Sequence, residues 1–201
     1  MEIQQSVDAK LQSLMKMLES RDGLIRQKAR LALVEMGDSA VIPLAEALRH
    51  STLDQTRWGA AKALGEIVDI RSIPALVNAL DDTDADVAWL AGMALKKFEK
   101  AAWMLLLQKL IETGVDSIRL RNGVRHVFSN QKEAGFNDLL EELRTALEDT
   151  ALPESGGVVA GEILKRMRSD AAKAADAAEA AALEAAAAAE AAEATAAVDA
   201  D

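Results

Sequence analysis

The stretch that decides the fold is TRWGAAKAL, residues 56–64, because the chain repeats this pattern at nearly constant intervals. Similar blocks cover residues 25–33, 87–95 and 120–128, so that successive blocks start 31, 31 and 33 residues apart. Within each block the small or apolar positions fall at i, i+4, i+7 and i+8, which lie on one face of an α-helix. The pattern therefore predicts an array of helical units, each of which needs its neighbours to cover its apolar face.

A second apolar pattern of helical period precedes each block, so each unit is predicted to be a pair of antiparallel helices. Asp22, Asp54 and Asp84 fall in the turns between paired helices, where a carboxylate can accept hydrogen bonds from the free N–H groups of the second helix. The predicted repeat domain spans residues 1–168, and its pairs cover residues 6–37, 40–68, 72–98, 101–129 and, with a weaker pattern, 136–168.

Residues 169–201 differ sharply in composition, since 20 of these 33 residues are alanine, eight are Asp or Glu and one is Lys. The tail thus carries −7 of the net charge of −10, which leaves −3 for residues 1–168. Alanine and glutamate favour helix, but Leu183 and Val198 are the only large apolar residues and form no stripe to bury. We expect a low-complexity acidic tail that is disordered or a marginal helix, with docking on the repeat domain as the open alternative.

The rest of the composition narrows the class of protein. The chain contains no cysteine, which excludes a disulfide framework and a thiolate metal site. Its first residues lack a basic region followed by an apolar one, and no stretch approaches the ~20 apolar residues of a membrane span. We therefore expect a soluble, cytoplasmic protein with no membrane partner.

Signs of catalysis are sparse. The two histidines, His50 and His126, lack the adjacent carboxylate of a His-Glu metal-binding dipeptide. The pair Gly156-Gly157 lacks the Lys-Ser/Thr of a phosphate-binding loop. A weakly acidic repeat domain also argues against a nucleic-acid groove. We predict that the protein is not an enzyme, with no catalytic residue, no metal, no cofactor and no nucleic-acid partner.

Residues 56–65 and 73–76 resemble HEAT-like repeats of the phycobilisome-lyase type, whose signature is Val-Arg-x-x-Ala-x-x-Ala-Leu-Gly followed by Ile-Pro-x-Leu. The resemblance is close over residues 22–98, fair to residue 129 and weak over 136–168. It implies an all-α fold, an α-solenoid wound as a right-handed superhelix of four to five HEAT-like antiparallel helix pairs, followed by the Ala/Glu-rich C-terminal tail.

The resemblance also implies a ladder between an arginine of each repeat and aspartates of the turns. Arg26, Arg57 and Arg121 match the arginine position, and Ala88 replaces it in the third repeat. The ladder is therefore expected at three steps and interrupted at one.

By resemblance, the second helix of each pair lines the concave surface, including residues 158–165 of the fifth pair. Trp58 and Trp89 take equivalent exposed positions, roughly 10 Å apart at the usual helix spacing. Tryptophan is enriched at binding hot spots, so we interpret both as groove anchors; the alternative is local packing. Trp103 is predicted to be core. The predicted partner-binding residues are Leu31, Trp58, Lys62, Trp89, Met93, Lys96, Asn122 and His126.

A basic stretch around the third and fourth pairs has two interpretations. It could bind an acidic peptide, including the chain's own tail. Alternatively, Arg121 is a ladder residue and the lysines lie in the last turn of a helix, where they favour the helix dipole. The stretch consists of Lys96, Lys97, Lys100, Arg119, Arg121 and Arg125.

These features together predict a non-enzymatic scaffold or adaptor that binds another protein or peptide on the concave face of a HEAT-repeat solenoid. The alternative, which rests on the resemblance alone, is a phycobilin-lyase-like or chaperone-like accessory protein that assists the attachment of a chromophore or cofactor. The pattern specifies neither the partner nor an oligomeric state.

Overall fold

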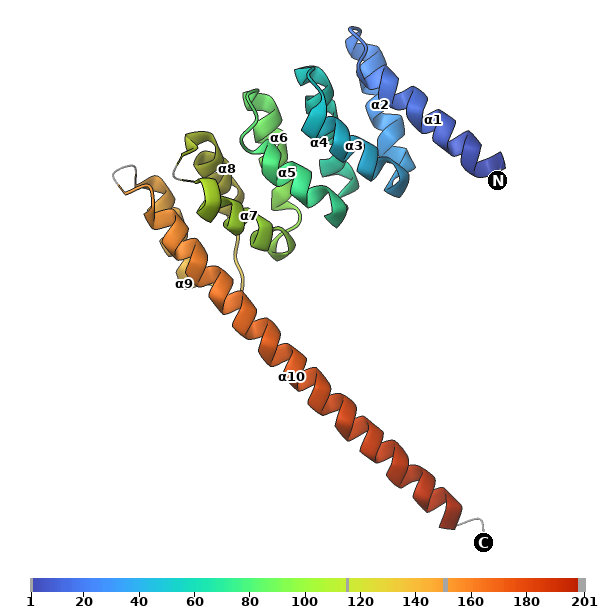
Figure 1. Cartoon of the computed structure of the whole chain (residues 1–201), viewed down its shortest axis with the longest axis vertical. Coiled ribbons are helices and arrows are strands. Elements are labelled where there is room, and N and C mark those ends of the chain that lie inside the picture. The colour runs from blue at the N-terminus through green and yellow to red at the C-terminus, as the bar shows by residue number, and fades with distance from the viewer. Residues whose placement is uncertain (1, 115, 150–151, 199–201) are drawn as a thin grey trace. The chain divides into compact units, whose positions relative to one another are not determined.

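The computed structural model describes residues 2–114, 116–149 and 152–198, and these residues form helices joined by short turns, with no β-strand among them (Figure 1). The chain divides into two compact units, residues 1–161 and 162–201. The first unit is a stack of helix pairs, so the predicted all-α solenoid is confirmed. None of the described helices is long and apolar enough to cross a membrane.

Four helix pairs follow one another along the chain, and a 3₁₀ turn, η1, at Ile70–Ser72 leads into the third. The pairs are α1 (Glu2–Leu18) with α2 (Gly23–Met36), α3 (Asp38–His50) with α4 (Asp54–Ile67), α5 (Ile73–Ala79) with α6 (Ala85–Lys96), and α7 (Lys100–Thr113) with α8 (Ile118–Phe128). They are followed by α9 (Asn137–Glu148) and α10 (Ser155–Val198).

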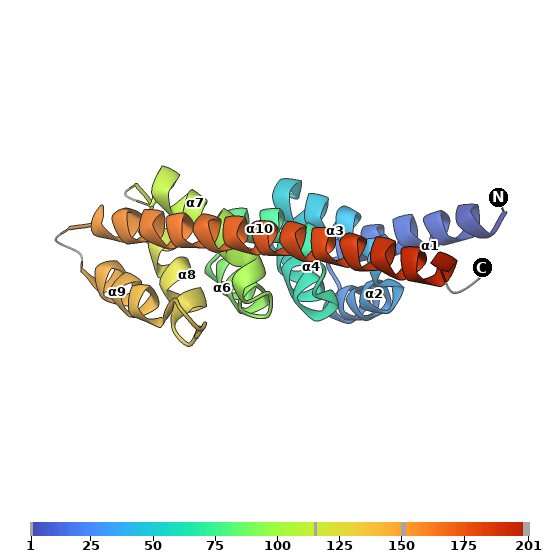
Figure 2. The same ribbon diagram turned by 90° about the horizontal axis from the view of Figure 1, so that it is seen from below.

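The helices of these four pairs form two layers. The first helices α1, α3, α5 and α7 contact one another in chain order, and the second helices α2, α4, α6 and α8 do the same. Figure 2 shows α2, α4, α6 and α8 on one side of the stack of helix pairs and α3 and α7 on the other. A ligand that lies along the second-helix layer can therefore meet side chains from four repeats.

Small residues let the second helices approach closely. A Cβ added to Gly65 of α4 would lie 2.9 Å from the Cβ of Ala94 in α6, and one added to Gly92 of α6 would lie 3.2 Å from the Cδ2 atom of His126 in α8. Larger side chains would force these helices apart, because protein interiors are packed without spare volume. The glycines thus fix the spacing at which the outer residues of the second helices stand beside one another.

All three predicted aspartates accept a hydrogen bond from a backbone N–H group at the start of a second helix, and two of them hold the cap position itself. Asp22 and Asp84 accept hydrogen bonds from backbone N–H groups in the first turns of α2 and α6, as predicted. The cap position of α4 belongs to Leu53, but the Asp54 carboxylate accepts a hydrogen bond of 2.8 Å from the Gln55 N–H, so the predicted acceptor role holds at this position too. Asp54 is the first helical residue, where its carboxylate still favours the positive end of the helix dipole.

The fifth pair is arranged differently from the prediction. The helix predicted to be the first of the fifth pair, α9, packs instead on α8 and so extends the second-helix layer (Figure 2). The start of α10 instead approaches α7, because a Cβ added to Gly157 would lie 3.9 Å from the Cα of Ile111. Two contacts hold α9 there: Phe136, just before it, packs on Trp103, and Arg144 donates to the Phe128 carbonyl at the end of α8.

Helix α10 runs without interruption from Ser155 to Val198, so the described part of the acidic tail is helical. Near its start, Val159, Ala160, Ile163 and Leu164 are buried. From residue 168 to residue 182 every side chain is exposed, as expected for a segment without an apolar stripe. The marginal stability of this helix in solution stays a prediction.

Candidate protein-interaction face

The eight residues predicted to bind a partner all lie on second helices. We call this set the tryptophan face, and it draws on α2, α4, α6 and α8. Its members are Leu31 on α2, Trp58 and Lys62 on α4, Trp89, Met93 and Lys96 on α6, and Asn122 and His126 on α8.

The large apolar side chains of the tryptophan face reach the surface. Trp89 is 56% exposed, Leu31 45%, Met93 38% and Trp58 36%, whereas Trp103 of α7 is 1% exposed. The prediction that Trp103 belongs to the core is confirmed. Two of the three tryptophans are thus left on one layer of the protein, where their rings remain in contact with water.

The ring of Trp58 is partly covered by Lys62, one turn further along α4. The Lys62 ammonium nitrogen lies 4.9 Å from the ring centroid, which is within the range of a cation–π interaction. Such a contact is weak at an exposed site, about 0.5–1 kcal/mol, so an incoming ligand can displace or use it. Trp58 therefore offers both an apolar surface and an adjacent positive charge.

A groove of about 680 Å³ lies beside Trp58 and is lined by residues of α2, α4 and α6. Its wall combines cations, carboxylates and the neutral amides of Gln27 and Gln55. Arg30 in this wall forms an ion pair with Glu66 of α4, with a distance of 2.5 Å between Nη1 and Oε1. The groove thus has a mixed charge and a single large aromatic wall.

Side-chain contacts connect α6 with α8 and with Ser129, the residue that follows α8. The His126 Nε2 atom lies 3.4 Å from the Met93 sulfur, and Lys96 donates a hydrogen bond of 3.1 Å to the Ser129 hydroxyl. Burial lowers the pKa of His126 below its usual range, and the charge of Lys96 lowers it further. At neutral pH the imidazole is therefore mostly uncharged.

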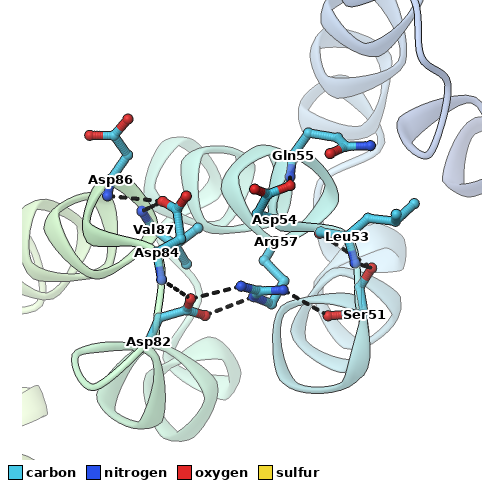
Figure 3. Close-up of polar contacts among 9 residues, drawn as sticks. All are labelled: Ser51, Leu53, Asp54, Gln55, Arg57, Asp82, Asp84, Asp86 and Val87. Carbon is cyan, nitrogen blue, oxygen red and sulfur yellow. Dashed lines mark hydrogen bonds and ion pairs between the residues drawn. The ribbon is translucent and has the colours of Figure 1, made fainter.

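The arginine ladder is built at one repeat. Arg57 donates two hydrogen bonds to the Asp82 carboxylate, of 2.8 and 2.9 Å, and a third of 3.0 Å to the Ser51 carbonyl (Figure 3). Both side chains are largely buried, at 13% and 9% exposed. Burial alone would raise the pKa of Asp82, but hydrogen bonds from Arg57 and from the Asp84 N–H outweigh it and hold this pKa below its ordinary value.

The other two expected ladder steps are absent, because the partner residue is absent from the sequence. Asp82 follows Arg57 by 25 residues, whereas the same offset from Arg26 reaches Ser51 and from Arg121 reaches Ala146. Arg26 donates instead to the backbone carbonyls of residues 20 and 21, at 2.8 and 3.0 Å. Arg121 makes no side-chain hydrogen bond to any residue in the described ranges, so its predicted structural role is wrong.

Most cations of the basic stretch are engaged in contacts between repeats. Lys97 donates to the Gly65 carbonyl at 2.6 Å, and Arg119 lies 3.4 Å from Asp81. Lys100 begins α7 and pairs with Glu133 at 2.9 Å, so the prediction that all three lysines lie in a last helical turn is wrong. Only Lys96 lies in the last turn of α6. The stretch is therefore not a continuous free basic patch.

The sequence interpretation missed the contribution of α9. A pocket of about 320 Å³ lies between α8 and α9, and Arg144 and Glu148 of α9 line it together with Asn122 and His126 of the tryptophan face. No local pattern marks Arg144 and Glu148, since their position depends on the packing of α9 on α8. Among the described residues, no group of three or more His, Cys, Asp or Glu side chains could hold a metal ion.

Comparison with known proteins points to one repeat family. Residues 43–125, from α3 to α8, match the family described as HEAT repeats. No curated protein matches the chain. The match and the stacked helix pairs support a HEAT-repeat protein, while the narrower resemblance to repeats of the phycobilisome-lyase type stays a prediction.

Proposed function

We propose that this protein is a non-enzymatic scaffold that binds another protein or a peptide along the second-helix layer, with Trp58 and Trp89 as its principal anchors. HEAT repeats commonly mediate protein–protein interactions, which is the general function expected of such a stack. Beyond this general function, we propose which surface binds the partner and which residues anchor it. The partner then lies across α4, α6 and α8, which carry seven of the eight residues of the tryptophan face.

The observation that carries the proposal is the exposure of Trp89. A side chain of this size and 56% exposed leaves an unusually large apolar area in water, although its helix is packed on both sides by α4 and α8. Tryptophan is enriched among residues whose truncation costs a complex most of its affinity. Met93, one turn further along α6 and 38% exposed, extends the same apolar strip.

The charges around the anchors add specificity. Lys62 stands beside Trp58, and Lys96 lies in the last turn of the helix that carries Trp89. Helix α8 contains three arginines and one histidine but no carboxylate. Charged groups around an apolar centre steer the partner and set its register, while the buried apolar contacts supply most of the affinity. No observation favours the chromophore-attachment alternative, so the scaffold is the function proposed.

Acrylamide quenching of tryptophan fluorescence tests the placement of the anchors. In the free protein the quencher should reach Trp58 and Trp89, because their rings contact water, and it should be excluded from Trp103. The partner, captured with the full chain and identified by mass spectrometry, should lower the quenching constant because a hot-spot aromatic loses its water on binding.

The matched control for this measurement is the variant Trp58→Phe/Trp89→Phe, whose remaining fluorescence comes from Trp103. Its quenching should be low and should not change when the partner is added. Unchanged quenching of the wild-type protein upon binding would place the partner elsewhere and would contradict the proposal.

A further inference from the structure

The pocket between α8 and α9 gathers groups that bind anions. It measures about 320 Å³. Its wall contains two guanidinium groups, an imidazole, a hydroxyl and a side-chain amide, but only one carboxylate. The lining residues are Asn122, Arg125, His126, Ser129, Arg144 and Glu148.

Two donors of the pocket, Arg144 and Ser129, are positioned by neighbouring groups. Arg144 donates to the Phe128 carbonyl at 3.5 Å and pairs with Glu141, which holds its guanidinium against the end of α8. The Ser129 hydroxyl donates to the His126 carbonyl at 2.8 Å and accepts from the Lys96 ammonium at 3.1 Å. A site whose donors are held in place binds with a smaller loss of side-chain entropy.

Arg125 is the cation best placed to bind a ligand. Its side chain is exposed, and it makes no side-chain hydrogen bond or ion pair with any residue in the described part of the chain. Its own helix provides no carboxylate to compensate its charge. A guanidinium presents a planar fork of N–H donors that matches the two oxygens of a carboxylate or phosphoryl group.

We infer that the α8–α9 pocket is an oxyanion subsite, which takes a carboxylate or phosphoryl group from the peptide whose apolar side chains cover Trp58 and Trp89. This inference rests on the proposed function. The bound peptide would then be acidic or phosphorylated at the end that lies over α8, and apolar at the end that lies over α4 and α6.

The pocket is continuous with the tryptophan face. Asn122 and His126 belong to both, and His126 touches Met93 of the neighbouring helix. Adjacent packed helices are about 8–10 Å apart, so a peptide of about six extended residues spans from α4 to α8. A single short segment can therefore contact the apolar strip and the pocket together.

The imidazole of His126 provides a direct reporter of the anion. The charged and titratable groups around it are Lys96 from α6, Arg125 from its own helix, and Arg144 and Glu148 from α9. An oxyanion close to the ring favours the imidazolium and so raises the pKa of His126, opposing the effects of burial and Lys96. An apolar ligand in the same pocket would lower this pKa further.

Nuclear magnetic resonance titration of the full-length chain with two small probes tests the subsite. The probes are the N-acetyl, N-methylamide derivatives of O-phosphoserine and of glutamate, which carry the two alternative oxyanions. We expect chemical-shift changes confined to residues 122–129 and 144–148, and a rise of roughly one pH unit in the pKa of His126 at saturation. Tighter binding of the phosphoserine probe would identify a phosphorylated partner, and equal binding would identify a carboxylate-rich one.

The matched substitutions are Arg125→Gln in the pocket and Arg119→Gln outside it on the same helix. Both positions are exposed, so both variants should keep the wild-type melting temperature. Arg125→Gln should weaken probe binding by about tenfold, as expected for loss of a charge-assisted hydrogen bond, and Arg119→Gln should leave it unchanged. Equal effects of the two variants, or shifts spread over the surface, would overturn the subsite.

The absence of any chemical-shift change with either probe would overturn it as well. Neither probe needs the protein partner or an apolar anchor. Failure of the probes to bind thus removes the oxyanion subsite alone, whereas failure of the proposed function appears in the quenching of the tryptophans.

Discussion

Replacing Trp103 with alanine is expected to lower the free energy of unfolding by about 3–5 kcal/mol, because Trp103 is the largest fully buried side chain among the described residues. Its ring is 1% exposed and packs on two other aromatic rings, with centroid distances of 5.5 Å to Phe128 and 5.8 Å to Phe136. These contacts join α7, α8 and the start of α9. Their loss would open a cavity at the point where the fourth pair meets α9.

Denaturant unfolding followed by circular dichroism measures this loss. Trp89→Ala is the matched control, because the same change at an exposed ring should alter stability by only about 0.5 kcal/mol. Trp103→Phe should cost less than Trp103→Ala, since it retains an aromatic ring, and the indole N–H that it removes is buried without a hydrogen-bond partner among the described residues. An unchanged unfolding midpoint for Trp103→Ala would show that the aromatic cluster does not stabilise the fold.

Replacing Asp82 with alanine should lower the free energy of unfolding by about 2–3 kcal/mol, a smaller loss than that of Trp103→Ala. The substitution leaves the largely buried Arg57 guanidinium with the Ser51 carbonyl as its remaining acceptor, and it removes the acceptor of the Asp84 N–H. Asp38→Ala is the matched control, because Asp38 pairs with Arg71 at 2.8 Å but is 86% exposed. Exposed ion pairs contribute about 0–1 kcal/mol.

The effect of Asp82→Ala should also depend on pH. Hydrogen bonds from Arg57 and the Asp84 N–H hold the pKa of Asp82 below that of an unfolded carboxyl, about 3.9. The stabilisation by this ion pair is therefore complete above pH 5 and is lost as the pH falls through the folded-state pKa. The stability difference between wild type and variant should shrink below pH 4; a difference that grows there would contradict the assigned ionisation.

Features that depend on local periodicity were predictable from the sequence. The 31-residue spacing and the helical period determine which residues face outward, and they place Trp58 and Trp89 at equivalent exposed positions and Trp103 inside. The Asp22 and Asp84 caps are predictable for the same reason, because a cap involves residues within one turn of each other.

Features that depend on distant partners were not predictable from the repeat pattern. The arginine motif occurs three times, but only Arg57 is followed by an aspartate 25 residues later. The motif alone therefore predicts more ladder steps than the protein forms. The position of α9 depends on the contact of Phe136 with Trp103, two residues far apart in sequence. Arg144 enters the pocket only as a result of that packing, and its own sequence neighbourhood carries no signal for it.

The most direct test of the central claim is the dissociation constant of the partner complex for Trp58→Ala/Trp89→Ala, compared with Met104→Ala/Leu105→Ala. The control pair lies on the first-helix layer, where Met104 is 51% and Leu105 40% exposed, so both variants remove exposed apolar side chains. We predict that the tryptophan variant keeps its stability and weakens binding by at least about 2 kcal/mol, roughly 30-fold, while the control pair leaves binding unchanged. Weaker binding by the control pair and full affinity of the tryptophan variant would place the partner on the opposite layer and contradict the account.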